Sequence, residues 1–170
     1  MYKRQVERGS ADWQALATLN EEVITSFGLL RGVTHLEYIK GRDDGRMYFL
    51  EAGARVGGAH VADLILASTG VDLWREWADI EIDKGDAPYA LPPRRFQHGG
   101  LLQCLARTER PDLSAYTDPE IVLQTDDPDH AGLVVCSPSH ARVRELLDDY
   151  TRRFAEDFLA VMPAQPPPVR

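Results

Sequence analysis

The feature that most limits the fold of this chain is a pair of strand-like segments joined by a short polar loop. Residues 33–40 and 46–55 alternate apolar and polar side chains, as β-strands do, and "GRDDG" lies between them. A polar, glycine-bounded loop between two such runs is typical of a β-hairpin. The sequence therefore predicts an antiparallel ribbon, and the register of that ribbon decides which side chains share a face.

Two carboxylates lie within the predicted ribbon, Glu37 on the first strand and Glu51 on the second. With the loop centred on Asp43, Glu51 lies opposite His35. Glu37 and Glu51 are then diagonal neighbours on one face, with α-carbons roughly 7–8 Å apart. Since side chains alternate along a strand, one face is predicted to carry His35, Glu37, Ile39, Met47, Phe49, Glu51, Gly53 and Arg55.

These residue types favour a site for a metal ion and a phosphate. Two carboxylates on a half-apolar face repel each other and lose hydration, which a divalent cation relieves by accepting their oxygens as ligands. Arg55 offers a planar cation suited to phosphate, and Gly53 lets a ligand approach the backbone. His35 faces Glu51 in this register and could hydrogen-bond to that carboxylate or bind the metal itself, although a structural role is favoured. A second interpretation stays open because the register is assumed: Glu37 and Arg55 would form a partly exposed ion pair on a sheet edge, and Glu51 would be solvated.

The other segments predict helices and further strands, and the fold class is α+β. Ser10 can cap a helix that ends at Gly28, a second helix ends at Gly70, and Asp72 can cap a third. Strands are expected in "GGLLQCLAR", "EIVLQ" and "AGLVVCS". A long amphipathic helix follows in residues 137–160, capped by Ser137 or Ser139. The whole is predicted to be an antiparallel sheet flanked by helices.

Composition limits the partners and the compartment. The chain has 170 residues and a net charge of −8, which argues against nucleic acid or an anionic membrane as a partner. No apolar run approaches the roughly 20 residues of a membrane span, and the first residues given do not have the pattern of a signal peptide. Cys104 and Cys136 have no metal-ligand spacing and are expected to be free thiols. These features predict a cytoplasmic protein.

The first five residues, "MYKRQ", are similar to what the end of a transposon-type sequencing adaptor would encode. They predict that residues 1–5 are a non-native scar and that the reading frame begins partway through a longer gene. We therefore leave these residues out of the sequence-based fold.

The ribbon and the helix after it resemble the ATP-grasp superfamily, in particular its carboxylate–amine (L-amino-acid) ligases. The stretch "GVTHLEYIKGRDDGRMYFLEAGARVGGAHVADLILASTGVDLW" has the H-x-E strand, the E-x-x-x-R strand and the glycine-led helix of that family's C-terminal portion. The resemblance implies an ATP-grasp C-terminal lobe over residues 6–82, with the metal and phosphate site. It also implies a linker loop over 83–98 and a small α/β subdomain over 99–161, and we expect a disordered tail over 162–170.

The resemblance also implies a reaction and its cofactors. Glu37 and Glu51 would bind the Mg²⁺ ions that accompany ATP, Arg55 would hold the γ-phosphate or an acyl phosphate, and Ile39 would lie against adenine. The enzyme would activate a small carboxylate substrate as an acyl phosphate and join it to an amine co-substrate. A carboxylase-type ATP-grasp enzyme and a non-catalytic interaction module derived from the fold are the alternatives.

Two departures from the family pattern affect these expectations. Gly53 stands where many ATP-grasp enzymes have an asparagine ligand, so the number of bound metal ions, one or two, stays open. The lobe whose lysines and glycine-rich loop cover the phosphates is missing, so this fragment is expected to bind ATP weakly and to lack activity. The substrate and the oligomeric state, including a homodimer of the full-length enzyme, also stay open.

Two other polar segments are candidates of lower priority. His60 follows the double glycine and could line an amino-acid pocket, although a solvated or capping role is favoured. "DDPDH" at residues 126–130 lacks the glycine and terminal glutamate of a calcium loop and is predicted to be a polar turn.

Overall fold

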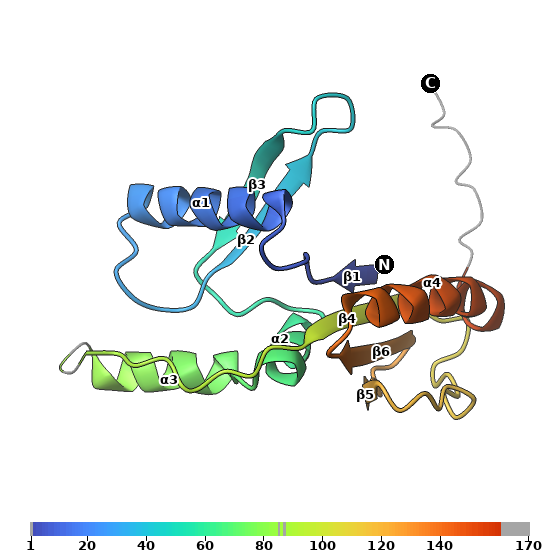
Figure 1. Cartoon of the computed structure of the whole chain (residues 1–170). Helices are drawn as coiled ribbons and strands as arrows, with labels where there is room; N and C mark the ends of the chain where they lie inside the picture. Colours follow the sequence, from blue (N-terminus) through green and yellow to red (C-terminus); the bar gives the residue numbers. More distant parts are fainter. Residues whose placement is uncertain (1, 85, 87, 161–170) are drawn as a thin grey trace, which may run out of the picture.

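The chain forms a four-stranded antiparallel sheet with helices on both faces, and a separate β-hairpin beside a long helix (Figure 1). The computed structural model describes residues 2–84, 86 and 88–160. Its elements are β1 (Tyr2–Arg4), α1 (Ala11–Ser26), β2 (His35–Lys40), β3 (Met47–Gly53), α2 (Val61–Thr69), α3 (Leu73–Asp83), β4 (His98–Leu105), β5 (Ile121–Gln124), β6 (His130–Ser137) and α4 (His140–Asp157). The α+β class with antiparallel sheets flanked by helices is thus confirmed.

The helix ends follow the capping signals of the sequence. Ser10 accepts a hydrogen bond from the Trp13 amide at the start of α1, and Asp72 accepts from two amides at the start of α3. At the C-cap of α2, Gly70 adopts a left-handed conformation with φ of 80°. Of the two serines proposed to cap α4, it is Ser139 that accepts from the first turn. Local side-chain chemistry therefore sets these helix boundaries.

The sheet has the strand order β1-β4-β6-β5. Residues 2–4, which the sequence-based fold left out, pair with β4, and Tyr2 lies opposite Leu102. The Gln5 side chain accepts from the Gly99 amide and donates to the Ser68 hydroxyl at 2.6 Å. Whatever their origin, these first residues therefore have a defined place at one edge of the sheet.

Two adjacent glycines of β4 let helices approach both faces of the sheet. A Cβ at Gly99 would lie 2.5 Å from a Leu64 methyl group on α2, and a Cβ at Gly100 would lie 2.6 Å from a Leu147 methyl group on α4. Successive residues of a strand face opposite sides, so α2 and α4 cover opposite faces. Leu64 of α2 packs in one hydrophobic cluster with Leu101 of β4 and Val134 of β6. The segments predicted as a lobe (6–82) and a subdomain (99–161) therefore pack together, although the loop at 83–98 separates them in sequence.

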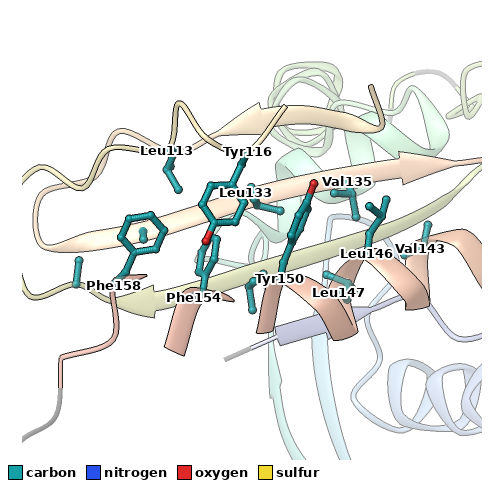
Figure 2. Packing of buried hydrophobic residues seen from close by; sticks show 13 residues of the cluster. Leu113, Tyr116, Leu133, Val135, Val143, Leu146, Leu147, Tyr150, Phe154 and Phe158 are labelled. Atoms are coloured by element: carbon teal, nitrogen blue, oxygen red, sulfur yellow. The ribbon is translucent and has the colours of Figure 1, made fainter. Parts of the chain in front are cut away.

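The main core lies between α4 and the sheet (Figure 2). Tyr116 from the loop before β5 packs edge-on against Tyr150 and Phe154 of α4. The Tyr116 hydroxyl donates to Asp157 at 2.8 Å, and the Tyr150 hydroxyl donates to Asp118. Burial, reinforced by these hydrogen bonds, raises the pKa of both tyrosines. Their apolar bodies and bonded hydroxyl groups together fix the loop that precedes β5.

The hairpin β2–β3 and helix α1 form a looser part of the molecule. No residue of α1 is buried, and α1 crosses the hairpin in Figure 1. A cavity of about 260 Å³ lies between them, lined among others by Val23 of α1, by Phe27 at the C-cap of α1, and by Leu36 and Ala52 of the hairpin. The hairpin therefore leaves much of its surface exposed.

Three further expectations concern the whole chain. Cys104 and Cys136 are free thiols, as predicted. Among the described residues, no helix has both the length and the apolar character needed to cross a bilayer. The tail proposed over 162–170 lies outside the described residues.

Candidate metal and phosphate site

The register of the hairpin brings the two carboxylates closer than the sequence predicts. Glu37 pairs directly with Glu51, and His35 pairs with Gly53 instead of Glu51. The predicted diagonal placement of the two acids was wrong, because the loop is not centred on Asp43 and a β-bulge shifts the register between Glu37 and Tyr38. The loop is instead closed around Asp44, which accepts from the Arg46 amide and from the Tyr48 hydroxyl.

Because of the bulge, the apolar residue of β3 that shares a face with the acids is Tyr48 and not, as the sequence predicted, Phe49. Tyr38 pairs with Phe49, and their rings meet edge-on at 6.0 Å. Phe49 was predicted to face the same side as Glu37 and lies instead on the side of Tyr38. The neighbour of Ile39 across the ribbon is Tyr48, and both side chains are about half exposed. An apolar strip still lies beside the acids, formed by Ile39 and Tyr48.

His35, Glu37 and Glu51 form a compact cluster of potential metal ligands, and within the described ranges no other set of three or more such residues comes this close. One ligand atom from each lies within 4.8 Å of the others, and His35 Nε2 is 3.9 Å from Glu37 Oε1. In an octahedral Mg²⁺ site with bonds of about 2.1 Å, neighbouring donors lie roughly 3.0 Å apart and opposite donors about 4.2 Å apart. Small rotations of the half-buried Glu37 and the exposed Glu51 side chains would therefore suffice to close the cluster on an ion.

Two glycines give the cluster its shape. A Cβ at Gly53 would lie 3.1 Å from the stem of Arg55, and a Cβ at Gly57 would lie 3.1 Å from the His35 ring. Most real Cβ contacts are longer than this, so a larger residue at either position would displace Arg55 or His35. The glycines of "EAGARVGG" thus leave space for the two basic side chains next to the acids.

Arg55 contacts the second acid rather than the first. Its Nη2 lies 3.9 Å from Glu51 Oε1, and its Nη1 donates to the Val56 carbonyl oxygen at 3.2 Å. The alternative ion pair between Glu37 and Arg55 is not what the structure forms. Arg55 remains about half exposed, with guanidinium donors available to an anionic ligand.

Comparison with known proteins finds similarity in structure only. No protein-family model matches the chain, and no curated protein matches its sequence. The chain is similar to the crystal structure of L-amino acid ligase from Bacillus licheniformis, with a TM-score of 0.59 and 15% identity over 94% of this chain. It is also similar to the crystal structure of phosphoribosylglycinamide synthetase from Anaerococcus prevotii, with a TM-score of 0.56 and 14% identity over 95% of this chain.

The chain has an ATP-grasp fold. Both neighbours are ATP-grasp carboxylate–amine ligases, and the match takes in nearly all of this chain. The chain spans 43% and 44% of the lengths of these two neighbours. The predicted fold is thus confirmed, while at this level of identity the ATP-grasp fold leaves substrate and activity to be argued from the site.

A second polar cluster joins the start of α2 to the turn before β6, and sequence reasoning did not find it. His60 bonds Asp63 through Nδ1 at 2.8 Å and Asp127 through Nε2 at 2.5 Å. Burial lowers the pKa of His60, but the hydrogen bonds and charges of the two aspartates outweigh burial and raise it above the usual value. The "DDPDH" segment is the predicted turn, but its second aspartate also fixes the helix that follows the Arg55 loop. Because Asp127 is distant in sequence from His60, no local signal indicated this contact.

Proposed function

We propose that this chain is the metal- and phosphate-binding part of an ATP-dependent carboxylate–amine ligase. The observation that carries the proposal is the direct pairing of Glu37 with Glu51 in an ATP-grasp fold, with Arg55 beside Glu51. Carboxylate oxygens are the ligands that Mg²⁺ prefers, and a guanidinium group binds phosphoryl oxygens in a planar fork. The same part of the chain therefore supplies both kinds of contact that Mg-ATP requires.

Each residue has a defined task in this proposal. Glu37 and Glu51 hold Mg²⁺, which when bound offsets negative charge on the phosphates of ATP. Arg55 binds the phosphoryl group during its transfer to the substrate carboxylate, as a cation does when charge spreads over phosphoryl oxygens. Ile39, which is about half exposed, packs against the adenine ring. The amine then displaces the phosphate and forms an amide bond.

The partner and compartment assignments follow from the same proposal. The substrates are a small carboxylate and an amine, and the protein acts in the cytoplasm without nucleic acid or a membrane as partner. A preceding lobe covers the phosphates. Since the chain spans less than half of its structural neighbours, we expect it alone to bind Mg-ATP weakly and to have no measurable turnover.

The first test measures Mg²⁺-dependent binding of ATP by the 170-residue chain. Saturation-transfer NMR of the adenine protons detects the bound nucleotide. Wild-type protein should give a signal that requires Mg²⁺. Glu51→Gln should lose the Mg²⁺ dependence, while Glu21→Gln, an exposed glutamate of α1, should behave like wild type. Equal Mg²⁺-dependent binding by wild type and Glu51→Gln would remove the proposed metal role.

The second test follows the products when a preceding ATP-grasp lobe is supplied as a separate protein or by fusion. The ligase proposal predicts ADP and phosphate release that requires both a carboxylate and an amine. Release that depends on bicarbonate instead would favour a carboxylase. Binding of a protein partner with no nucleotide turnover would favour the non-catalytic module.

A further inference from the structure

We propose that His35 is a direct metal ligand, so that the site binds Mn²⁺ and similar transition-metal ions in preference to Mg²⁺. This inference rests on the proposed function in one respect, which is that a metal ion binds at Glu37 and Glu51. It goes beyond that function in assigning a nitrogen donor to the site and in naming the class of ion that this donor selects.

The strand geometry places the His35 ring on the carboxylate side of the ribbon. His35 and Glu37 are two residues apart on β2, so their side chains project from the same face. Across the ribbon, His35 pairs with Gly53, which has no side chain to separate the ring from Glu51. Gly57 leaves room for the ring, because a Cβ at this position would lie 3.1 Å from His35 Cδ2.

The ring presents one nitrogen to the acids. His35 Nδ1 is buried, and no group in the described part of the chain hydrogen-bonds to it. Nε2 lies 3.9 Å from Glu37 Oε1, which is too long for a hydrogen bond. A nitrogen of the His35 ring therefore lies within 4.8 Å of an oxygen of each carboxylate, and in the described part of the chain no hydrogen bond joins the ring to either acid. A cation bound by this nitrogen and by both carboxylates would relieve the repulsion between the two acids.

The donor set determines which ion fits. Mg²⁺ is bound through oxygen and keeps several of its waters, so Glu37 and Glu51 can hold it without His35. Imidazole suits transition-metal ions, and the affinity of a mixed nitrogen and oxygen site increases from Mn²⁺ toward Cu²⁺. A site with one imidazole and two carboxylates therefore gains affinity for Mn²⁺ that it does not gain for Mg²⁺.

Pulsed electron paramagnetic resonance of the 170-residue chain with Mn²⁺ alone tests the assignment, because the method detects nitrogen bound to Mn²⁺. Wild-type protein should show a coordinated nitrogen, and His35→Gln should lose it. Removing the ligand should weaken Mn²⁺ binding at least about 10-fold, as the loss of groups around metal sites does. Mg²⁺ affinity, measured by competition with Mn²⁺, should change by less than about 3-fold because Mg²⁺ does not depend on nitrogen ligands.

His60→Gln is the matched control and should keep the nitrogen signal, since His60 is held by Asp63 and Asp127. The proposal fails if wild-type protein binds no Mn²⁺, if its bound Mn²⁺ shows no nitrogen, or if His35→Gln retains the signal. Circular dichroism shows whether His35→Gln is folded; if it is not, His35→Asn takes its place, and a folded variant that keeps the nitrogen signal overturns the assignment to His35.

The outcomes separate this inference from the ligase proposal. Nitrogen-coordinated Mn²⁺ without ATP binding would support the metal assignment and contradict the proposed function. Mg²⁺-dependent ATP binding with an all-oxygen Mn²⁺ signal would support the proposed function and overturn the role of His35, leaving it as a structural side chain.

Discussion

Gly100→Ala is expected to destabilise the protein by about 1–3 kcal/mol, the usual cost of adding a methyl group to a packed core. The new Cβ would lie 2.6 Å from Leu147 Cδ1 and 3.0 Å from Val143 Cγ1. Carbon atoms pack best at about 3.5–4.0 Å, so the closest contact is too short by about 1 Å. Leu147 and Val143 are at most 1% exposed, so neither can move into solvent to relieve the contact.

Urea unfolding, monitored by circular dichroism, gives the free energy of unfolding. A double-mutant cycle then tests whether the new methyl group contacts Leu147. Leu147→Ala alone should cost about 2–5 kcal/mol through the cavity it leaves. In the double variant the alanine methyl group fills part of that cavity, so the combined cost should be smaller than the sum by roughly 1–3 kcal/mol. Gly58→Ala is the control and should stay within about 0.5 kcal/mol, because nothing lies within 4 Å of its Cβ. If Gly100→Ala is neutral, or if the two effects add, α4 does not pack on Gly100 as described.

The remaining predictions concern charges and a helix cap. The pKa of His60 is raised in the folded protein, so its bonds to Asp63 and Asp127 stabilise the protein fully below about pH 6.5 and less as the pH rises through the folded pKa. The melting temperature of wild type should therefore exceed that of His60→Gln most at mildly acidic pH. A difference that stays constant up to alkaline pH would contradict this. Arg142 lowers the pKa of Glu120 through a hydrogen bond at 2.9 Å. Wild type should therefore be more stable than Arg142→Gln above about pH 4.3, and this advantage should be lost as the pH falls through the lowered pKa of Glu120. Melting temperatures of both proteins, measured from neutral to acidic pH, test this loss. Asp72→Ala should cost about 0.5–2 kcal/mol through loss of the cap of α3, measured by urea unfolding, and an unchanged midpoint would show that α3 does not depend on this cap.

The sequence predicted much of the fold because many of its signals are local. Ser10, Gly70 and Asp72 act within a few residues, through a hydrogen bond to the first turn or through a left-handed backbone conformation. The strands of the main sheet are apolar runs that any buried β-strand requires. Such features depend on the neighbouring residues alone, so they can be inferred without knowing the rest of the molecule.

The site was predicted in part. Glu37, Glu51 and Arg55 were identified as neighbours, and they are neighbours. Their register was wrong, because a bulge adds a residue to one strand at a position that strand propensity does not reveal. At the acids the predicted register was wrong by an even number of residues, so both acids were still placed on one face. At Phe49 it was wrong by an odd number, so Phe49 was assigned to the wrong face.

The sequence by itself determined the α+β class, the helix ends and the residue types of the site, because these depend on periodicity and on local hydrogen bonds. Only the tertiary structure decided that Glu37 lies directly opposite Glu51, that His60 bonds Asp127, and that Gly99 and Gly100 receive α2 and α4 on opposite faces. The physical reason is distance along the chain. Contacts between residues far apart in sequence depend on how whole elements pack, and no local preference of either residue specifies that packing.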